Sequence, residues 1–349
     1  MTGERVRRPP GPEAARQRAE RRAQRIATGA TELEERLVDL LRGGLAGADR
    51  DGHPAWEETA ARMVDAQAPG LASRIRELGA LPPGQDWPER MLSECALLHL
   101  LNRGLLTSAS LPEPLAATVR ARAGITVDSA ELLADEAALV RDEWLVMAQR
   151  DSEEGRLTAH RTWLYGRASG RPALLLSYAM AGRVPELALP VDPVGSVLDA
   201  ELAFYPGARP LRAALGRRHA EPGTGFVPPG GTVSDALAGY GAALCDDPWL
   251  ENWPAVLSEV VPIPAAPEDE DERDGGGGWQ VADVARGTPG RAGSSGGDSA
   301  LPVTPATSST ALWKLASISG GGPVTVFGEC GHRGFTPYTA WSGAEAVPL

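Results

Sequence analysis

Residues 88–106 read PERMLSECALLHLLNRGLL and carry the strongest helical pattern in the chain. Pro88 stands in the first turn, where a backbone N–H would have no intrahelical partner in any case. Apolar side chains recur at intervals of three and four residues, which places them on one face of a helix. The stretch therefore predicts a buried helix, with core candidates Met91, Leu92, Cys95, Leu98, His99, Leu101 and Leu105.

Further helical patterns lie on both sides of this stretch. Thr31 and Glu34 have the spacing of a capping box ahead of a leucine-rich amphipathic run. The connections are short, as in helices that pack as a bundle. We therefore expect a disordered lead-in over residues 1–11 and a helical domain over residues 12–130. Its expected helices span residues 12–27, 31–45, 54–66, 71–78, 88–106 and 112–122.

The pattern changes near residue 140, where segments rich in β-formers begin. Turn sequences such as Gly166–Gly170 separate these segments, which favours an antiparallel meander. Residues 140–265 are expected to form a mixed domain of strands and helices. Its expected strands span residues 144–148, 157–165, 172–178 and 198–205, and its expected helices span residues 210–218, 233–244 and 249–260.

An acidic, glycine-rich stretch at residues 266–278 has the composition of a flexible linker, because Glu268–Asp274 hold six acids and one arginine and run into four glycines. Residues 279–349 are expected to form a small β domain with a flexible loop at residues 287–310. No repeat with a period of 20 to 50 residues is found. The predicted fold class is α+β: a helical domain, a mixed middle region with an antiparallel sheet, and a C-terminal β domain. The expected C-terminal strands span residues 279–284, 312–319, 324–329 and 335–341.

The composition excludes several classes of protein. The 46 acidic and 34 basic residues give a net charge of −12, which argues against a generic nucleic-acid binder. The longest apolar runs are far shorter than the roughly 20 residues that span a bilayer, and no signal peptide is visible. Cys95, Cys245 and Cys330 are too far apart in the sequence to form a disulfide framework. A cytoplasmic protein is the expectation.

No motif predicts a catalytic, cofactor or metal site. Residues 293–297, GSSGG, match the hydrolase spelling G-x-S-x-G but lack the strand before and the helix after the serine. Cys330 and His332 are the only short Cys/His pair, and zinc needs two more ligands. We interpret residues 329–334 as a turn between strands and His99 as a satisfied core or boundary histidine. The chain is expected to be non-enzymatic.

Two features suggest contact with a partner. The predicted helix over residues 12–27 is rich in arginine and would contact an acidic partner or nucleic acid, or would simply be a solvated extension. Nine tryptophans exceed the four phenylalanines. Tryptophans anchor partner surfaces, but filling corners between core helices is the default interpretation. The candidate contact residues are Arg16, Arg18, Arg21, Arg22 and Arg25.

Several phrases resemble one protein family. The stretch Met63–Leu71, Arg156–Leu164 and the C-terminal phrase Ser319–Glu329 are similar to actinobacterial SWIM zinc-finger family proteins. Further matching phrases are Trp87-Pro88-Glu89-Arg90 with Leu97–Leu101, Phe204-Tyr205-Pro206-Gly207, Pro210-Leu211-Arg212 and Trp253-Pro254-Ala255-Val256. The resemblance runs from about residue 12 to the C-terminus.

The resemblance implies an accessory protein that recognises a protein partner. Members of that family are similar to proteins encoded beside MoxR-type AAA ATPases and von Willebrand A-domain proteins. The family's C-x-C…C-x-H zinc motif is absent from this sequence, so zinc is implied only for the missing motif, which we expect to be lost or to lie upstream of Met1. The alternative is a nucleic-acid-associated factor that uses the arginine-rich helix.

Overall fold

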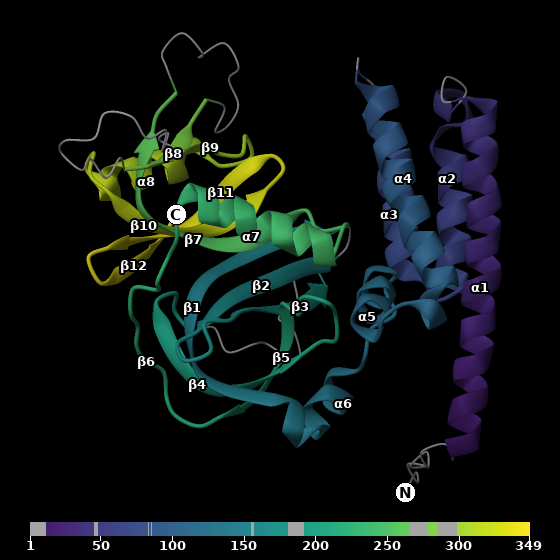
Figure 1. Ribbon diagram of the computed structural model, residues 1–349, viewed down its shortest axis with the longest axis horizontal. Coiled ribbons are helices and arrows are strands. Elements are labelled where there is room, and N and C mark those ends of the chain that lie inside the picture. The colour runs from purple at the N-terminus through teal and green to yellow at the C-terminus, as the bar shows by residue number, and fades with distance from the viewer. Residues whose placement is uncertain are drawn as a thin grey trace, which may run out of the picture. The chain divides into compact units, whose positions relative to one another are not determined.

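The computed structural model divides into two compact units (Figure 1). The helical unit contains Met1–Thr126 and Pro206–Ala208, and the β unit contains Val127–Tyr205 and Arg209–Leu349. The predicted lead-in, nearly all of the predicted linker and residues 287–298 of the predicted loop lie outside the described residues. The structure describes residues 12–44, 48–82, 84, 86–154, 157–180, 192–265, 278–284 and 299–349.

The helical unit has an apolar interior in which Leu33, Met63, Ile75 and Leu101 are at most 1% exposed. The helices expected over residues 71–78, 88–106 and 112–122 are confirmed to within two residues. Its elements are α1 (Pro12–Gly43), α2 (Ala48–Asp65), α3 (Pro69–Gly79), α4 (Trp87–Leu106), a short 3₁₀ turn (Ser108–Ser110) and α5 (Glu113–Arg122).

The prediction that a capping box at Thr31 begins a new helix is wrong. The two helices expected over residues 12–27 and 31–45 form one continuous helix, α1. The Thr31 hydroxyl donates to the Ala27 carbonyl, 2.9 Å away, as in a helix interior. Gly29 lies so close to α2 that an added Cβ would be 2.9 Å from Met63 Cε. This packing holds residues 28–30 helical, so tertiary contact overrides the local capping signal.

The first sheet of the β unit closes into a five-stranded barrel, barrel A. The long strand β1 pairs with both β2 and β4, and β3 runs parallel to β5. A short helix, α6 (Ser129–Ala134), and a 3₁₀ turn (Glu136–Ala138) precede it. Its strands are β1 (Leu139–Glu154), β2 (Leu157–Gly166), β3 (Pro172–Met180), β4 (Ser196–Phe204) and β5 (Arg212–Arg218), and β6 (Gly223–Thr224) pairs with β4.

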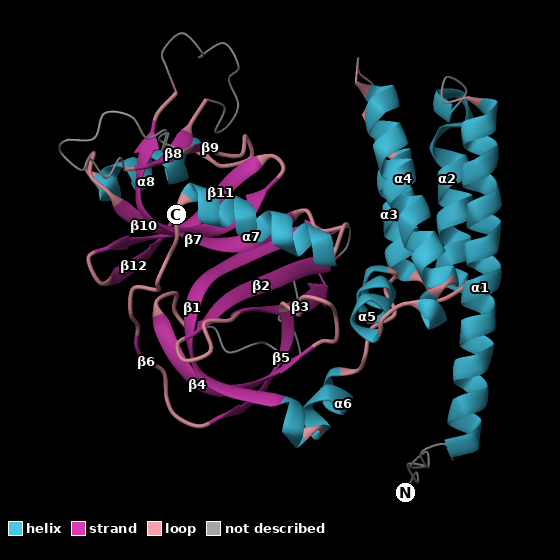
Figure 2. Cartoon of the chain, viewed as in Figure 1, coloured by secondary structure: helices cyan, strands magenta, loops and turns pink. Residues whose placement is uncertain are grey.

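The second sheet has the same connectivity and forms barrel B. Its first strand, β7, pairs with β8 and β10, and Val303 beyond β9 forms a parallel bridge to Phe335 of β11. Figure 2 shows the strands of both barrels and the helices that accompany barrel B. The elements are α7 (Val233–Asp246), β7 (Asn252–Ile263), β8 (Gln280–Asp283), β9 (Ala300–Pro302), α8 (Ser309–Ser319), β10 (Val324–Gly331), β11 (Gly334–Ser342) and β12 (Glu345–Pro348).

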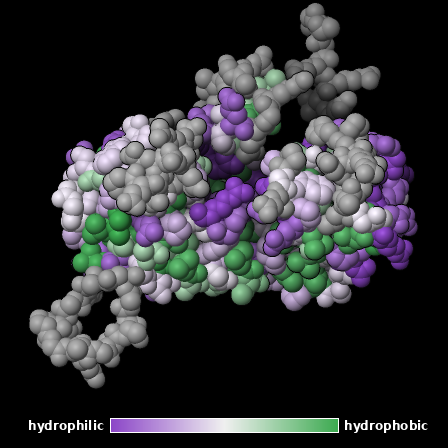
Figure 3. All heavy atoms as spheres, turned by 90° about the horizontal axis from the view of Figure 1, so that it is seen from above, coloured by the Kyte–Doolittle hydropathy of each residue, from purple (hydrophilic) through white to green (hydrophobic). Residues whose placement is uncertain are grey.

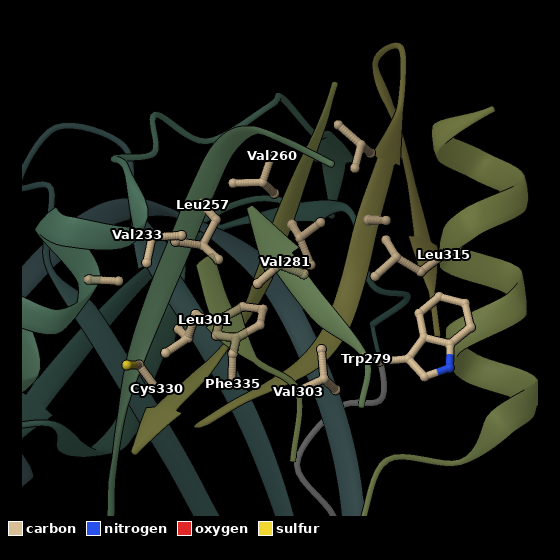
Figure 4. Packing of buried hydrophobic residues seen from close by; sticks show 14 of the residues in the cluster. Val233, Leu257, Val260, Trp279, Val281, Leu301, Val303, Leu315, Cys330 and Phe335 are labelled. Atoms are coloured by element: carbon tan, nitrogen blue, oxygen red, sulfur yellow. The ribbon is translucent and has the colours of Figure 1, made fainter. Parts of the chain in front are cut away.

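In each barrel the first strand pairs with the second and fourth, and the third runs parallel to the fifth. This is the connectivity of OB-fold barrels. Barrel A encloses Trp144, Leu164 and Leu202, and the Trp144 indole N–H donates to the Ala200 carbonyl at 3.1 Å. Barrel B encloses a separate core that includes Phe335 (Figure 4). The β unit is thus a tandem of two similar barrels, although the sequence shows no repeat.

The outer faces of the two barrels pack against each other. Met147 and Trp163 of barrel A contact a cluster that includes Phe327 and Trp341 of barrel B. The Thr339 hydroxyl donates to the Met147 carbonyl at 2.7 Å. Barrel B therefore covers one end of the outer face of β1, β2 and β3.

Two expected helices are strands, which corrects the prediction for residues 210–218 and 249–260. Residues 212–218 form β5, which pairs with β3 on one side and β4 on the other. Residues 252–260 belong to β7, in which residues 252–257 and 260 pair with β10 and residues 260–263 pair with β8. Pairing on both sides outweighs the helix-forming composition of these segments.

The strand expected over residues 312–319 is instead a helix, α8. Ser308 caps its first turn by accepting from the Ala311 N–H, and Gly320 ends it with φ +55°. The described part of the predicted loop, residues 299–310, contains β9 and the start of α8. The expected strands over residues 157–165, 172–178, 198–205, 324–329 and 335–341, and the expected helix over residues 233–244, are confirmed.

Among the described residues, no helix is both long and apolar enough to cross a bilayer. On the face shown in Figure 3, apolar residues lie in separate clusters between hydrophilic ones.

Candidate functional site

The arginine-rich part of α1 is only partly free for contact. Arg21 and Arg25 are exposed, whereas Arg22 is half-buried. The Arg25 guanidinium donates to Gln67 Oε1 at 3.2 Å, so it is used within the unit. The side chains of Arg16 and Arg18 lie outside the described residues. The N-terminal part of α1 extends past the other helices of its unit (Figure 1).

A polar cluster joins α1 to α4 in the helical unit. Asn102 is fully buried, and its amide donates to the Ala30 carbonyl at 2.8 Å and to Glu34 at 3.0 Å. His99 has its Nδ1 3.1 Å from Glu34, so it is satisfied as expected, but it is exposed rather than in the core. Leu92, another core candidate, is also exposed, so both core expectations are wrong. Asn102 was not among the predicted site residues, although an Asn on the apolar face of α4 is the sequence signal for such a cluster.

Among the side chains that the structure describes, the cysteines and histidines do not come together as a metal site. Cys330 faces the core of barrel B, where burial raises the pKa of its thiol, and His332 is exposed in the turn between β10 and β11. The turn predicted at residues 329–334 is therefore confirmed. In the described parts of the chain, no group of three or more His, Cys, Asp or Glu residues is placed to hold a metal ion. The GSSGG stretch at residues 293–297 lies outside those parts.

The open end of the outer face of barrel A is the strongest candidate site. Along β2 and β3, alternate residues face outward, and cross-strand pairs share that face. Barrel B covers the first of these rows and leaves the last ones open. From the covered end to the open end, the rows are Ala148–Trp163–Leu174, Arg150–Arg161–Leu176, Ser152–Ala159–Tyr178 and Glu154–Leu157–Met180.

The open rows expose large apolar side chains beside arginines. Leu157 is 40% exposed, Tyr178 is 45% exposed and Met180 is 59% exposed. Arg150 is exposed and Arg161 is half-buried. We call Arg150, Leu157, Arg161, Tyr178 and Met180 the outer patch.

A polar pair from barrel B lies beside the arginines. The Tyr338 hydroxyl donates to Glu329 Oε2 at 2.6 Å, and the Arg150 guanidinium lies over the Tyr338 ring, 5.2 Å from its centre. Arg161 donates to the Ser152 hydroxyl. Trp163 packs against Tyr338 with ring centres 5.2 Å apart. The ring of Tyr338 is thus held between the barrels and supports one guanidinium of the outer patch.

Burial dominates the electrostatics of this pair. It raises the pKa of the Glu329 carboxyl, while the Tyr338 hydroxyl and the Arg161 guanidinium act in the opposite direction. Burial and the neighbouring Glu329 also raise the pKa of Tyr338. Burial therefore disfavours the charged form of Glu329, whereas Tyr338 and Arg161 favour it.

The tryptophans are mostly core residues, but the expectation that they fill corners between core helices is wrong for most of them. Of the buried ones only Trp56 lies in the helical unit, and Trp144, Trp163 and Trp341 lie on strands. Six of the nine are buried, whereas Trp313 on α8 is 62% exposed. Its ring meets buried Trp279 edge-on, with centres 5.2 Å apart and an angle of 89° between the planes. Trp313 is a single aromatic side chain on its helix surface, while the outer patch joins several exposed side chains.

Comparison with known proteins concerns mainly the helical unit. Residues 21–123 match the family model of the SWIM-associated four-helix bundle domain. This match supports a relation to SWIM-associated proteins. The matched range covers α2 to α5 and most of α1, so it does not include the outer patch. Neither the curated proteins nor the solved structures contain a match to this chain.

Proposed function

We propose that this chain is an accessory protein, without a catalytic site of its own, that binds a protein partner through the outer patch. The observation that carries the proposal is the adjacency of Leu157, Tyr178 and Met180, all exposed, on a closed barrel. Contiguous exposed apolar side chains mark interaction sites, and Tyr and Arg are enriched among the residues that dominate binding energy. A rigid barrel loses little conformational entropy on binding.

The proposed partners are a MoxR-type AAA ATPase or a von Willebrand A-domain protein. The resemblance of several phrases to SWIM zinc-finger proteins supports this proposal, and so does the match of the helical unit to the SWIM-associated bundle domain. In this proposal, the helical unit is the part shared with other SWIM-associated proteins, and the outer patch provides the contact that is specific for the partner.

Affinity capture with matched variants tests this function. The Tyr178→Ser/Met180→Ser variant and the wild-type chain are used as baits, and captured ATPase and A-domain proteins are quantified by mass spectrometry. Leu237→Ser removes an apolar side chain that is 44% exposed on α7 and serves as the control. We expect the double variant to lose capture about ten-fold or more and the control to retain it. Equal capture by all three baits would sink the proposal.

A second candidate function is nucleic-acid binding through α1. It is favoured by the exposure of Arg21 and Arg25 on a helix that extends past its neighbours. Residues 12–25 hold five arginines and two glutamates, a local charge of +3. Titration of a single-stranded oligonucleotide at several salt concentrations tests it. Arg21→Ala/Arg25→Ala should lower the salt slope by about 0.7 per lost phosphate contact, and an unchanged slope would contradict it.

A further inference from the structure

We propose that a second copy of this chain packs against the outer face of α4, so that two α4 helices pair antiparallel in a symmetric dimer. That face consists of Glu89, Leu92, Ala96, Leu100 and Arg103, which we call the α4 stripe. The inference goes beyond the proposed function and does not depend on it, because the stripe belongs to the helical unit and the outer patch belongs to barrel A.

Helix α4 has apolar residues on two opposite faces. On the outer face, Leu92 is 50% exposed, Leu100 is 47% exposed, and Ala96 between them is also exposed. A surface helix usually has polar residues on its outer side, and a helix that is apolar all round is usually buried. The outer face of α4 is therefore one that another element is expected to cover. The side chains that α4 buries in the bundle are Met91, Cys95, Leu98, Leu101, Asn102 and Leu105.

The outer faces of the neighbouring helices are charged instead. Arg62 of α2 pairs with Glu58 on the same helix at 2.6 Å and with Glu32 of α1 at 3.8 Å. Arg76 of α3 pairs with Glu57 of α2 at 2.8 Å. All of these side chains are largely exposed, so α1, α2 and α3 present ion pairs to solvent where α4 presents leucines.

The α4 stripe is symmetric about Ala96. Glu89 and Arg103 lie seven residues before and after it, and Leu92 and Leu100 lie four residues before and after it. At about 100° per residue, all five positions fall within an arc of about 80° around the helix, and the stripe is about 21 Å long. A two-fold axis at Ala96 therefore exchanges the two leucines and places the acid at the position of the base.

An antiparallel second copy fits every position of the stripe. Ala96 meets Ala96 of the second copy, and the small side chains allow the two helices to approach closely. Leu92 packs beside Leu100 of the second copy on each side of the axis. The seven-residue spacing of Glu89, Ala96 and Arg103 is that of helices that pair over two heptads. Such an interface is isologous, as in most symmetric dimers.

The two charges select this direction of pairing. Glu89 and Arg103 are exposed, and neither side chain forms an ion pair with another described residue. In the antiparallel dimer, each Glu89 lies opposite Arg103 of the second copy. A parallel dimer would place like charges against each other at both ends, which is unfavourable.

The size of the contact sets the expected affinity. A contact confined to one pair of helices lies below the roughly 1,200–2,000 Å² that stable protein interfaces bury. We therefore expect a reversible dimer with a dissociation constant of about 10 μM.

Sedimentation velocity of the full chain, from about 1 to 200 μM, tests the inference. The wild-type chain should shift from monomer to dimer over this range. Leu92→Gln/Leu100→Gln should raise the dissociation constant at least ten-fold. Leu41→Gln/Val64→Gln is the matched control, because Leu41 on α1 is 48% exposed and Val64 on α2 is 46% exposed, and it should dimerise as wild type does. Thermal unfolding of each variant shows that it is folded.

Charge reversal tests the pairing of Glu89 with Arg103. Glu89→Arg and Arg103→Glu should each weaken the dimer several-fold, because each places like charges opposite each other. The double variant Glu89→Arg/Arg103→Glu restores opposite charges and should dimerise about as tightly as wild type. Restoration by the double variant distinguishes pairing from a structural effect of either residue.

A cross-link tests the position of the axis. In the Cys245→Ser background, Ala96→Cys should form a disulfide between two copies when oxidised glutathione accepts the two electrons and two protons of the thiols. Arg90→Cys is the control, because residue 90 is exposed and six residues from the axis. Its two copies would be about 18 Å apart along the helices, beyond the roughly 7 Å that a disulfide can bridge.

Four results would overturn the inference. They are a wild-type chain that stays monomeric at every concentration, a dimer that Leu92→Gln/Leu100→Gln does not weaken, a charge-reversed double variant that does not recover, and equal cross-linking through positions 90 and 96. If the chain is monomeric and Leu92→Gln/Leu100→Gln instead loses captured proteins, the stripe binds another protein and the inference also falls. The proposed function is decided separately, by the capture experiment with Tyr178→Ser/Met180→Ser.

Discussion

The hydroxyl of Tyr338 donates a 2.6 Å hydrogen bond to Glu329, a partner on the adjacent strand β10. The bond lies where barrels A and B meet and holds the ring on which Arg150 stacks. The geometry of the outer patch therefore depends on a buried polar pair from the other barrel.

Glu329→Gln should stabilise the chain at neutral pH. Because burial raises the pKa of Glu329 in the folded state, its contribution is favourable at low pH and is lost as the pH rises through the folded pKa. Gln keeps an oxygen that accepts the Tyr338 hydroxyl but carries no charge. Unfolding curves from pH 4 to 8 should show the midpoint of the variant above that of wild type by a few degrees at pH 7 to 8. The difference between the two unfolding midpoints should become smaller toward pH 4.

A midpoint difference that does not depend on pH would contradict the assignment to Glu329. Tyr338→Phe is the companion variant: it removes the donor and leaves a buried acceptor unpaired, which costs about 1–3 kcal/mol. Its cost should be smaller in the Glu329→Gln background, as a double-mutant cycle measures directly.

Asn102→Asp should destabilise the helical unit strongly. Asn102 is fully buried, and its amide donates to Glu34 and to Ala30. Aspartate places a second carboxylate beside Glu34 without a donor, and an uncompensated buried charge costs about 3–5 kcal/mol. Asn102→Leu, which removes the polar group, should cost far less. Chemical denaturation measures both, and an equal loss in the two variants would show that packing rather than charge matters at this position.

Gly334→Ala should disrupt the closure of barrel B. Gly334 has φ +113°, and an added Cβ would be 2.2 Å from the Pro302 carbonyl oxygen, beside the parallel bridge from Val303 to Phe335. Gly343→Ala is the matched control, because Gly343 also has a positive φ (+60°) but faces open space. We expect the control to cost about 1 kcal/mol and Gly334→Ala several times more. Similar thermal unfolding midpoints for both variants would contradict the close contact between Gly334 and the Pro302 carbonyl.

One of the three cysteines should react with a thiol reagent in the native protein. Cys245 is exposed, whereas Cys95 and Cys330 are buried. Burial, with a smaller effect of Glu94, raises the pKa of Cys95 to about 11, and burial also raises the pKa of Cys330, so thiolate is scarce at both. Titration with an aromatic disulfide should count one thiol in buffer and three in denaturant. Cys245→Ser should leave none in buffer, and rapid labelling of a second thiol would contradict the burial of the other two.

The helices of the helical unit were predictable because their signals are local. In α4, an apolar face, a proline in the first turn and a length of 20 residues all agree. The same reasoning failed at Thr31, since the packing of Gly29 against Met63 keeps α1 continuous through an apparent cap. Local sequence signals therefore predict that a helix exists more reliably than they predict where it begins or ends.

The barrels were less predictable because their pairing is non-local. β5 has the composition of a helix but pairs with β3 and β4, and β7 lies before the acidic stretch but pairs with β10 after it. The repeated connectivity has no counterpart in a sequence repeat. Interior positions of a barrel require only apolar side chains of suitable size, and many sequences satisfy that requirement.

The outer patch could not be predicted from the sequence for a related reason. Alternation along β2 and β3 indicates two faces, with Arg161, Trp163, Tyr178 and Met180 on the same one. Alternation does not tell which rows of that face another barrel covers. Trp163 is buried against barrel B while Met180 is 59% exposed, although both lie on the same side of the sheet.

The sequence by itself determined the α+β class, the helical character of the N-terminal part and the turn after Cys330. These follow from composition and from interactions between residues close together in the chain. The tertiary structure alone decided that β1 and β7 each close a barrel, that Tyr338 fixes Arg150, and that the outer patch stays open. Strand pairing and barrel packing join residues far apart in the sequence, and the free energy of such contacts depends on the whole fold.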